Sequence, residues 1–420
     1  MVPPEEFMRR ALELAERGAG WTSPNPMVGA IVVKKNIILG EGWHEEFGGP
    51  HAEFLALHRA GALARGADLY VNLEPCVAAP GKHNPPCADA IIRAGIRRVF
   101  VAMRDPDPRV NGRGIERLQE AGLDVIEGLL EREARKLNEI YLKLKTTGLP
   151  FVTLKMAMTA DGKIATHTGD SRWISSEKSL RLAHELRHRH RAILVGIGTV
   201  LADDPQLTVR LEPLLDLSPS PSPEGGGEPL SPSPPSPLPS EGEGSTGVRG
   251  LREGVGVRSG KRGRGLGRNP IRIVLDSHGR VPVDAAVVRS AGETRTIIAT
   301  TDAMPLEKEQ ALRQTHVEVW RLPAAADGRV ALAALIQKLA HEQLDSLLIE
   351  GGSEVAWSFL RARLVDKILL VIAPKIVGGR AAPSPVGGLG VERLSEAIPL
   401  RDVTVSALDG DILYEAYLDK

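Results

Sequence analysis

The sequence predicts an α/β protein of two domains, the second of which carries a long insertion. The chain has 420 residues, and single hydrophobic cores stop growing beyond roughly 250–300 residues. Segments with helical spacing alternate with short apolar segments typical of buried strands. A Gly-Leu-Pro linker signal near residue 147 divides the chain into domains 1–146 and 147–420.

The N-terminal domain is expected to start with a helix over 5–17, where apolar side chains recur at helical spacing. Two strands follow over 28–33 and 37–42, joined at a turn at Asn36. The later elements alternate, with helices over 52–64, 88–94, 114–121 and 135–145 and strands over 68–73 and 98–103. This alternation predicts an α/β sandwich.

The C-terminal domain repeats the alternation from Phe151, with a helix over 176–190 and a strand over 192–195. Residues 212–268 interrupt it with Ser-Pro repeats, Gly/Glu runs and a Gly/Arg-rich stretch, and a regular pattern resumes at 271–276. This block has too few large apolar side chains to offset the entropy of ordering, so we expect a disordered insertion. It is either a tolerated loop insertion or an RNA- or partner-binding segment. The first is favoured, because doubling a loop's length costs only about 0.6 kcal/mol.

Bulk composition excludes several classes of function. The 53 basic and 53 acidic residues cancel, so no overall field recruits nucleic acid or an anionic membrane. No stretch approaches the roughly 18 apolar residues of a membrane span, and the first ten residues lack an apolar signal core. We therefore expect a cytoplasmic protein. In that compartment the two cysteines indicate a metal site, reactive thiols or core packing rather than a disulfide.

The two cysteines lie in a pattern typical of zinc deaminases. His51 and Glu53 are at the start of a predicted helix, Cys76 follows a predicted strand, and Cys87 opens another helix. One imidazole and two thiolates supply three ligands, and the fourth tetrahedral position is left for water, whose pKa zinc lowers toward about 7. Glu53 would move protons from that water to the substrate. A buried structural pair of cysteines is the alternative.

The same region resembles the deaminase half of the bifunctional riboflavin-biosynthesis family (RibD). The resemblance rests on residues 25–29, 51–53, 73–76, 85–87, 105–108 and 111–114. It implies a cytidine-deaminase-like α/β/α sandwich with one Zn²⁺, in which Asn25 binds the pyrimidine edge. The chain departs from the family at 77–86, where the loop between the cysteines is longer. His44 is either a phosphate contact or a surface histidine.

The C-terminal domain has a second candidate site, at Glu350-Gly351-Gly352, where a predicted strand ends and a helix begins. Glycines there let a phosphate approach the free N–H groups of the helix. No Gly-x-Gly-x-x-Gly opens a helix, so a standard Rossmann domain is not indicated.

This domain resembles the reductase half of the same family, which has a dihydrofolate-reductase-like fold. The resembling segments are 155–162, 173–175, 196–210, 350–352 and 373–375. By resemblance, the NADPH site comprises Ala157, Trp173, Thr199, Asp203, Ser277, Gly351 and Gly352. The substrate site comprises Ser171, Arg187, Leu207, Arg210 and Glu350.

The resemblance implies two consecutive reactions. The first is hydrolytic deamination of 2,5-diamino-6-(5-phosphoribosylamino)pyrimidin-4(3H)-one, and the second is NADPH-dependent reduction of the ribosyl to the ribityl chain. Because the cofactor carries the hydride chemistry, no protein nucleophile is needed there, and Asp161 is a candidate acid. A homodimer built through the C-terminal domain is also expected.

Two other interpretations remain open. The first is a zinc deaminase of nucleosides or tRNA bases joined to a non-riboflavin reductase-like domain. It predicts a basic surface beside the zinc site, which Lys34, Lys35, Arg97 and Arg98 are too dispersed to supply. The second is a non-catalytic RNA-binding protein that acts through its Gly/Arg-rich insertion.

Overall fold

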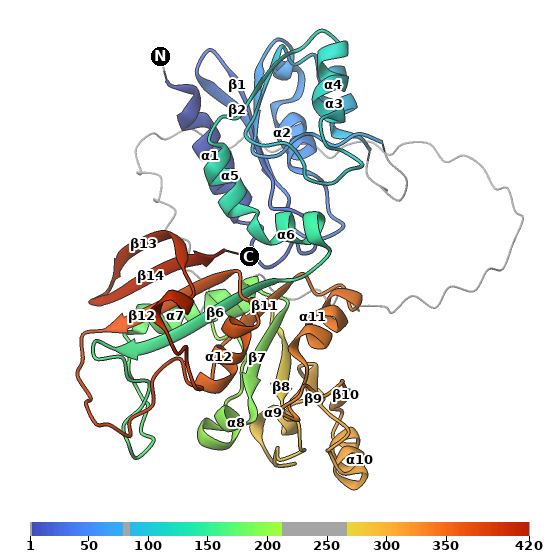
Figure 1. Ribbon diagram of the computed structural model, residues 1–420. Helices are drawn as coiled ribbons and strands as arrows, with labels where there is room; N and C mark the ends of the chain where they lie inside the picture. Colours follow the sequence, from blue (N-terminus) through green and yellow to red (C-terminus); the bar gives the residue numbers. More distant parts are fainter. Residues whose placement is uncertain (1, 79–84, 212–266, 420) are drawn as a thin grey trace, which may run out of the picture. The chain divides into compact units, whose positions relative to one another are not determined.

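The computed structural model describes residues 2–78, 85–211 and 267–419. The predicted disorder of 212–268 therefore lies outside the described residues, apart from Gly267 and Arg268. The described chain contains a five-stranded and a nine-stranded β-sheet (Figure 1). No helix in these ranges is long and apolar enough to cross a membrane.

The five-stranded sheet belongs to the N-terminal part of the chain and has the order β2-β1-β3-β4-β5. Strand β1 pairs antiparallel with β2 and β3, whereas β3, β4 and β5 run parallel. The strands are β1 (Gly29–Lys34), β2 (Ile37–Trp43), β3 (Asp68–Val71), β4 (Arg98–Val101) and β5 (Asp124–Glu127). The predicted hairpin around Asn36 is confirmed by the pairing of β1 with β2.

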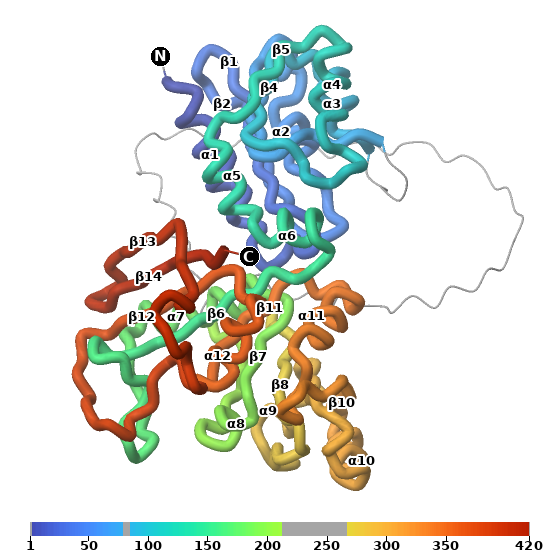
Figure 2. Tube along the Cα trace, in the orientation of Figure 1, coloured from blue at the N-terminus to red at the C-terminus, as the bar shows by residue number. Residues whose placement is uncertain are grey.

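Helices cover both faces of this sheet, as the tube in Figure 2 shows. The helices are α1 (Pro4–Glu16), α2 (Ala52–Ala60), α3 (Cys87–Ala94), α4 (Arg113–Glu120), α5 (Glu131–Leu137) and α6 (Glu139–Thr147), with a 3₁₀ turn at Gly61–Ala64. Val32 of β1 shares one core with α2, α3 and α4. Its neighbour Ile31 points to the other core, with α1 and α5. Since successive strand residues face opposite sides, the predicted α/β/α sandwich is confirmed.

The single helix predicted over 135–145 is wrong, because Asn138 separates α5 from α6. Its side chain is 2% exposed. The amide oxygen accepts from the Met27 N–H at 2.8 Å and the amide nitrogen donates to the Met27 carbonyl at 3.0 Å. An asparagine that pairs with another segment's backbone competes with helical geometry.

The nine-stranded sheet has the order β10-β9-β8-β7-β11-β6-β12-β14-β13. Its strands are β6 (Phe151–Thr159), β7 (Ala192–Gly196), β8 (Ile271–Leu275), β9 (Thr296–Thr300), β10 (Glu318–Arg321), β11 (Ser346–Ile349), β12 (Lys367–Ala373), β13 (Leu400–Leu408) and β14 (Asp411–Leu418). All neighbours are parallel except β14, which is antiparallel to β12 and β13. The predicted α/β class is confirmed here also.

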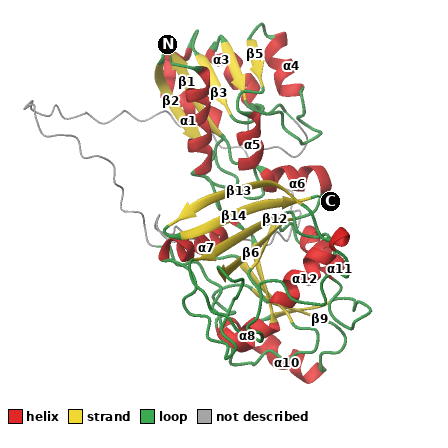
Figure 3. Ribbon diagram, turned by 60° about the vertical axis from the view of Figure 1, so that its left-hand side comes forward, coloured by secondary structure: helices red, strands yellow, loops and turns green. Residues whose placement is uncertain are grey.

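The helices of this part are red in Figure 3. They are α7 (Glu177–Arg189), α8 (Ile197–Asp203), α9 (Ala286–Arg289), α10 (Leu306–Gln314), α11 (Leu332–His341) and α12 (Ser353–Arg361), with a 3₁₀ turn at Leu394–Glu396. One core joins α11 and α12 to Leu194 of β7. The other joins α7, α9 and α10 to Val195 of the same strand.

The chain leaves and re-enters this domain at neighbouring points. The Val209 N–H donates to the Asn269 side-chain oxygen at 2.8 Å. On α7, His184 Nδ1 accepts from the Arg210 N–H at 3.2 Å, and His188 Nδ1 accepts from the Arg268 N–H at 2.9 Å. A long insertion can therefore start and end here without separating β7 from β8, which remain paired.

Candidate active sites

The predicted zinc ligands converge at one end of the N-terminal sheet. His51 immediately precedes α2, Cys87 is the first residue of α3, and Cys76 follows β3. The Ala88 N–H donates to the Cys76 carbonyl at 3.1 Å, which ties the loop after β3 to the start of α3. Both cysteines are unpaired by disulfide and buried.

The geometry of these three residues fits zinc. His51 Nδ1 lies 3.1 Å from Cys87 Sγ and 3.5 Å from Cys76 Sγ, and all three donor atoms lie within 4.8 Å of one another. Donors bound to zinc at about 2.0–2.3 Å in a tetrahedron are about 3.3–3.8 Å apart. The donor set is therefore that of a three-ligand zinc site, and the spacing of its donor atoms is close to the spacing that zinc requires.

The two sulfur atoms have different proton affinities. Hydrogen bonding with Cys87 and His51 lowers the pKa of the Cys76 thiol, and interaction with Cys76 together with burial raises the pKa of the Cys87 thiol. The Glu53 side chain beside them is 3% exposed, and burial raises its pKa. Glu53 is thus a buried carboxyl group next to the predicted ligands, as a proton carrier requires.

Asn25 and His44 form a second polar pair in this site. Asn25 Nδ2 lies 3.1 Å from His44 Nε2, and His44 Nδ1 lies 3.0 Å from the Pro50 carbonyl oxygen. These partners require a neutral ring that donates from Nδ1 and accepts at Nε2, and burial lowers the pKa of His44. His44 is 3% exposed, so the surface-histidine alternative is wrong.

These residues line a pocket of about 460 Å³, a size typical of small-molecule sites. Its lining comprises Asn25, Pro26, Val28, His44, Phe47, Gly48, His51, Glu53, Leu73, Glu74, Cys76, Asp105, Arg109, Tyr141 and Lys145. Residues 79–84 of the loop between the cysteines lie outside the described ranges, so the predicted departure from the family at 77–86 is described only at its two ends.

Glu74 is a residue whose role the motif alone did not reveal. Its buried carboxylate accepts from the N–H groups of Asp105, Gly112 and Gly114 at 3.1, 3.0 and 2.8 Å. A Cβ on Gly114 would lie 2.0 Å from the Pro75 carbonyl oxygen. The start of α4 therefore packs directly against the loop that carries Cys76.

The expected reductase residues gather at the carboxyl ends of adjacent parallel strands. Thr199 follows β7, Ser277 follows β8, Glu350 follows β11, and Ala157 lies near the end of β6. The strands β6, β11, β7 and β8 are consecutive in the sheet. Ligands of open α/β sheets bind at this edge.

A buried charge cluster lies at its centre. Arg187 of α7 donates from Nε and Nη2 to the two carboxylate oxygens of Glu350, at 2.7 and 2.6 Å. Their side chains are 14% and 8% exposed. Burial alone would raise the pKa of Glu350, but Arg187 outweighs it and lowers that pKa. The cluster also includes Lys155 of β6. Burial lowers the pKa of Lys155, and the negative charge of Glu350 opposes that effect. No role was predicted for Lys155.

The glycine turn after β11 is held by Thr199. The Gly352 N–H donates to Thr199 Oγ1 at 3.1 Å, and the Gly351 carbonyl accepts from the Gly196 N–H at 3.2 Å. Gly351 has φ +134°, a conformation that side chains rarely adopt. Three of the expected cofactor residues therefore meet at the start of α12.

The other expected residues lie around this edge. Arg172, between Ser171 and Trp173, donates to the Asp203 carbonyl at 3.0 Å, which joins that loop to the end of α8. Trp173 itself is 67% exposed. Leu207 is buried, and Arg210 is exposed.

Asp161 is bound to its own loop. Its carboxylate accepts from the Thr159 hydroxyl at 2.6 Å and the Gly378 N–H at 2.7 Å. These hydrogen bonds lower the pKa of Asp161 to about 2. They favour a structural role over that of a proton donor.

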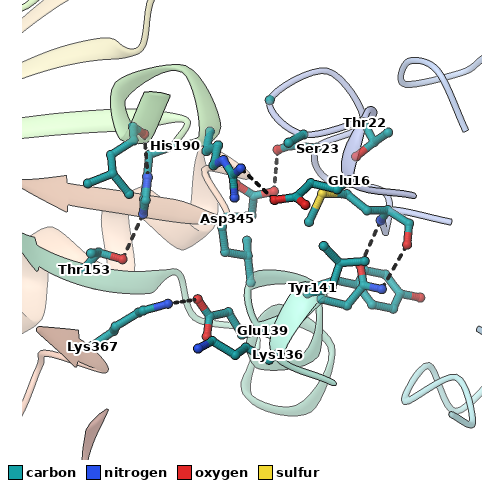
Figure 4. A pocket seen from close by; sticks show the side chains of 18 of the residues that line it. Glu16, Thr22, Ser23, Lys136, Glu139, Tyr141, Thr153, His190, Asp345 and Lys367 are labelled. Carbon is teal, nitrogen blue, oxygen red and sulfur yellow. Dashed lines mark hydrogen bonds and ion pairs between the residues drawn. The ribbon is translucent and has the colours of Figure 1, made fainter. Parts of the chain in front are cut away.

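A second cavity, of about 500 Å³, is lined by residues from both parts of the chain (Figure 4). Lys367 donates to Glu139 at 2.9 Å, His190 hydrogen-bonds to Thr153 at 2.9 Å, and Asp345 accepts from Ser23. Among the described site residues expected from the sequence, Asn25 alone lines this cavity. The polar groups named here are engaged with one another, so we assign the cavity no catalytic role.

Two family models match this chain. Residues 150–414 match the RibD C-terminal domain, and residues 1–103 match the cytidine and deoxycytidylate deaminase zinc-binding region. The riboflavin biosynthesis protein RibD of Actinobacillus pleuropneumoniae is 38% identical over 98% of this chain and 94% of its own length. That of Escherichia coli K12 is 38% identical over 94% and 93%.

Solved structures point to the same family. RibD of Acinetobacter baumannii superposes with a TM-score of 0.75 at 30% identity and covers 99% of each chain. A Thermotoga maritima diaminohydroxyphosphoribosylaminopyrimidine deaminase/5-amino-6-(5-phosphoribosylamino)uracil reductase has a TM-score of 0.73 at 35% identity, covering 99% of this chain and 98% of that one.

A deaminase-type zinc site and a reductase domain in one polypeptide define a bifunctional enzyme. The chain belongs to the RibD family of riboflavin biosynthesis. The cofactors predicted from the sequence, Zn²⁺ and NADPH, are those of this family. The alternative of a nucleoside or tRNA-base deaminase with a non-riboflavin reductase-like domain is not favoured.

Proposed function

We propose that this chain deaminates 2,5-diamino-6-(5-phosphoribosylamino)pyrimidin-4(3H)-one and then reduces the ribosyl group of the product with NADPH. The observation that carries the proposal is the meeting of His51, Cys76 and Cys87 with buried Glu53 in one pocket. The reductase match in the same chain supports the second step.

In the deaminase pocket, His51, Cys76 and Cys87 would hold zinc, which would supply Lewis-acid activation of a water molecule. Glu53 accepts a proton from the attacking water and delivers it to the ring nitrogen. It then transfers the second proton to the departing amino group, so that water and substrate give a carbonyl and ammonia. Asn25 binds the pyrimidine edge, and its amide is oriented because neutral His44 accepts its N–H.

When bound in the reductase site, NADPH would supply the hydride that reduces the sugar carbon bearing the amine. The ring C–O bond would break in that reduction, and the released oxygen would take a proton from solvent. Thr199, Gly351 and Gly352 lie where a cofactor phosphate would meet the start of α12. Ala157, Trp173, Asp203 and Ser277 complete the proposed cofactor site.

The two arginines of the substrate site have different roles in this proposal. Arg210 is exposed, and its side-chain hydrogen bonds to Gln206 and Thr208 are long, at 3.4 and 3.5 Å. Its guanidinium is therefore available for the substrate phosphate. Arg187 is engaged by Glu350 and the Thr208 carbonyl, so it positions Glu350 beside the substrate. Ser171 and Leu207 border the same ligand.

We further infer that the enzyme acts in the cytoplasm and as a homodimer. Two unpaired, buried cysteines at a predicted metal site suit a reducing compartment. The homodimer is carried over from the resemblance of the C-terminal domain, and sedimentation of the purified enzyme tests it.

The test is a coupled assay with purified, zinc-loaded enzyme. With the diamino substrate and no NADPH, we expect ammonia release alone. Adding NADPH should start its oxidation only after ammonia appears. Chelation of zinc should stop ammonia release but leave reduction of separately prepared deaminated substrate intact. A zinc-loaded enzyme that performs neither reaction would contradict the proposal.

A further inference from the structure

Two cations in the zinc pocket are unexplained by the deamination chemistry. Arg109 lies between β4 and α4, and Lys145 lies near the end of α6. Both line the same pocket as His51, Glu53 and Cys76. Among the described residues of this lining, they are the two with a permanent positive charge, since His44 is neutral as its partners require.

Both cations are anchored to one carboxylate. Arg109 donates from Nε and Nη2 to Asp107 at 3.0 and 2.6 Å, and Lys145 Nζ lies 3.2 Å from Asp107 Oδ2. The side chain of Asp107 is 6% exposed, whereas those of Arg109 and Lys145 are 50% and 27% exposed. The carboxylate is therefore buried beneath two cationic groups that remain accessible.

These groups have donors to spare. A guanidinium has five N–H donors and an ammonium has three. The hydrogen bonds with Asp107 leave Arg109 Nη1 and further protons on both groups free for a ligand. A phosphate with several acceptor oxygens matches two adjacent cations of this kind.

The position of the pair is fixed by its neighbours. The Tyr141 hydroxyl donates to Asp105 at 2.8 Å, and Asp105 accepts from the Asp107 N–H at 2.9 Å. Lys145 Nζ lies 5.5 Å from the centre of the Tyr141 ring. The nearby acidic groups are already hydrogen-bonded: Glu74 by backbone N–H groups, and Asp105 by Tyr141 and Asp107. An incoming anion therefore meets preorganised donors on Arg109 and Lys145.

We propose that Arg109 and Lys145 bind the phosphate of the phosphoribosyl group in the deaminase site and select phosphorylated substrates. This inference rests on the proposed function, because it specifies what the same pocket recognises. The pyrimidine lies at the zinc end, near Glu53 and Asn25, and the sugar phosphate extends to the cationic pair. Each cation lowers KM for the phosphorylated substrate without acting on the reacting carbon.

The test compares two substrates that differ only by the phosphate: the phosphoribosylamino-pyrimidine and its dephosphorylated counterpart. For Arg109→Ala and Lys145→Ala, kcat/KM for ammonia release should fall roughly 10- to 100-fold with the phosphorylated substrate. The fall should lie in KM. Activity with the dephosphorylated substrate should stay within about twofold, and Arg109→Lys should recover part of the loss.

Arg104→Ala is the matched control, because Arg104 lies on the same loop, pairs with Glu127 at 2.7 Å and does not line the pocket. It should alter neither substrate's kinetics. Zinc content and NADPH-dependent reduction, measured on each variant, establish that it is folded.

Equal losses with both substrates would overturn the proposal and give the pair a purely structural role. Unchanged kinetics would overturn it as well. As a second measurement, inorganic phosphate should inhibit the wild type competitively and lose this effect in Arg109→Ala; equal inhibition of both would contradict the proposal. Wild-type enzyme that releases ammonia from neither substrate would instead sink the proposed function.

Discussion

The two active sites of this enzyme are built in different ways. The proposed deaminase site gathers four side chains in one place. The donor atoms of the three predicted zinc ligands lie within 4.8 Å of one another, and Glu53, the proposed proton carrier, is 3% exposed. The residues expected for the reductase site are spread along the carboxyl ends of β6, β11, β7 and β8, and Trp173, one of the expected residues, is 67% exposed. Where the protein itself must hold metal and move protons, its groups are clustered; where a cofactor carries the hydride, the protein supplies surfaces and phosphate contacts.

The largest effect should come from removing a predicted zinc ligand of the deaminase site. In Cys87→Ala, zinc content should fall to near zero and ammonia release should drop by roughly three orders of magnitude. Reduction of separately supplied deaminated substrate should be retained, because Cys87 belongs to the part of the chain with the five-stranded sheet and the expected reductase residues to the part with the nine-stranded sheet. Metal analysis and the two separate assays check this. Equal loss of both activities would show that the sites are not independent in this way.

The residues expected for the reductase site include one closely packed, largely buried charge pair, Arg187 and Glu350. Removing one partner of this pair should have a large effect on stability. Arg187→Met removes both hydrogen bonds to the buried Glu350 carboxylate and leaves Lys155 as its remaining cation, so it should lower the free energy of unfolding by up to about 3–5 kcal/mol. Adding Glu350→Gln should restore part of this loss, because the buried carboxylate is removed while Lys155 loses its partner. Urea unfolding of both single variants and the double variant measures the coupling. A loss below about 1 kcal/mol for Arg187→Met would show that the pair is as solvated as a surface ion pair.

A substitution at Gly114 tests the close packing of α4 against the loop that carries Cys76. Because a Cβ there would lie 2.0 Å from the Pro75 oxygen, Gly114→Ala should cost about 1–3 kcal/mol of stability and weaken zinc retention. Gly292→Ala is the matched control, since its Cβ would meet nothing closer than 3.5 Å. Similar unfolding midpoints for the two variants would contradict the close packing described here.

His190 should give a smaller, pH-dependent effect on the reductase side. Burial lowers its pKa to about 4, while it hydrogen-bonds to the Leu186 carbonyl and to Thr153. As pH falls from about 6.5 to 4, the unfolded chain protonates this histidine and the folded chain does not. Stability is therefore lost in that window, by at most about 3 kcal/mol.

Replacing His190 with Gln removes the titrating group, so the variant should lose less stability than the wild type between pH 6.5 and 4.5. Urea midpoints across this range provide the measurement. Parallel pH curves for the two proteins would rule out the assigned protonation.

Most of the deaminase site could be predicted from the sequence because its signals are local. Each predicted zinc ligand lies at a strand or helix end within a short motif, and the motif fixes both the residue type and its position. The break at Asn138 could not be predicted, because its cause is a hydrogen bond to Met27, 111 residues away.

The reductase cluster was only partly predictable for the same reason. Arg187 and Glu350 were expected as separate substrate contacts, but their pairing spans 163 residues. Lys155 lies in a strand between apolar residues, and nothing local indicates that its charge is balanced by Glu350. Side chains that depend on distant partners for their role become visible only once the strands are arranged in the sheet.

The central claim, that a zinc site with Glu53 as its proton carrier performs the deamination, is tested most directly with Glu53→Gln. Zinc per chain and ammonia release are measured together for this variant and the wild type. The account predicts about one zinc in both, with ammonia release reduced roughly 10²- to 10⁴-fold in the variant. A variant that keeps its zinc and its activity would contradict the role of Glu53, and a wild type without zinc would contradict the site itself.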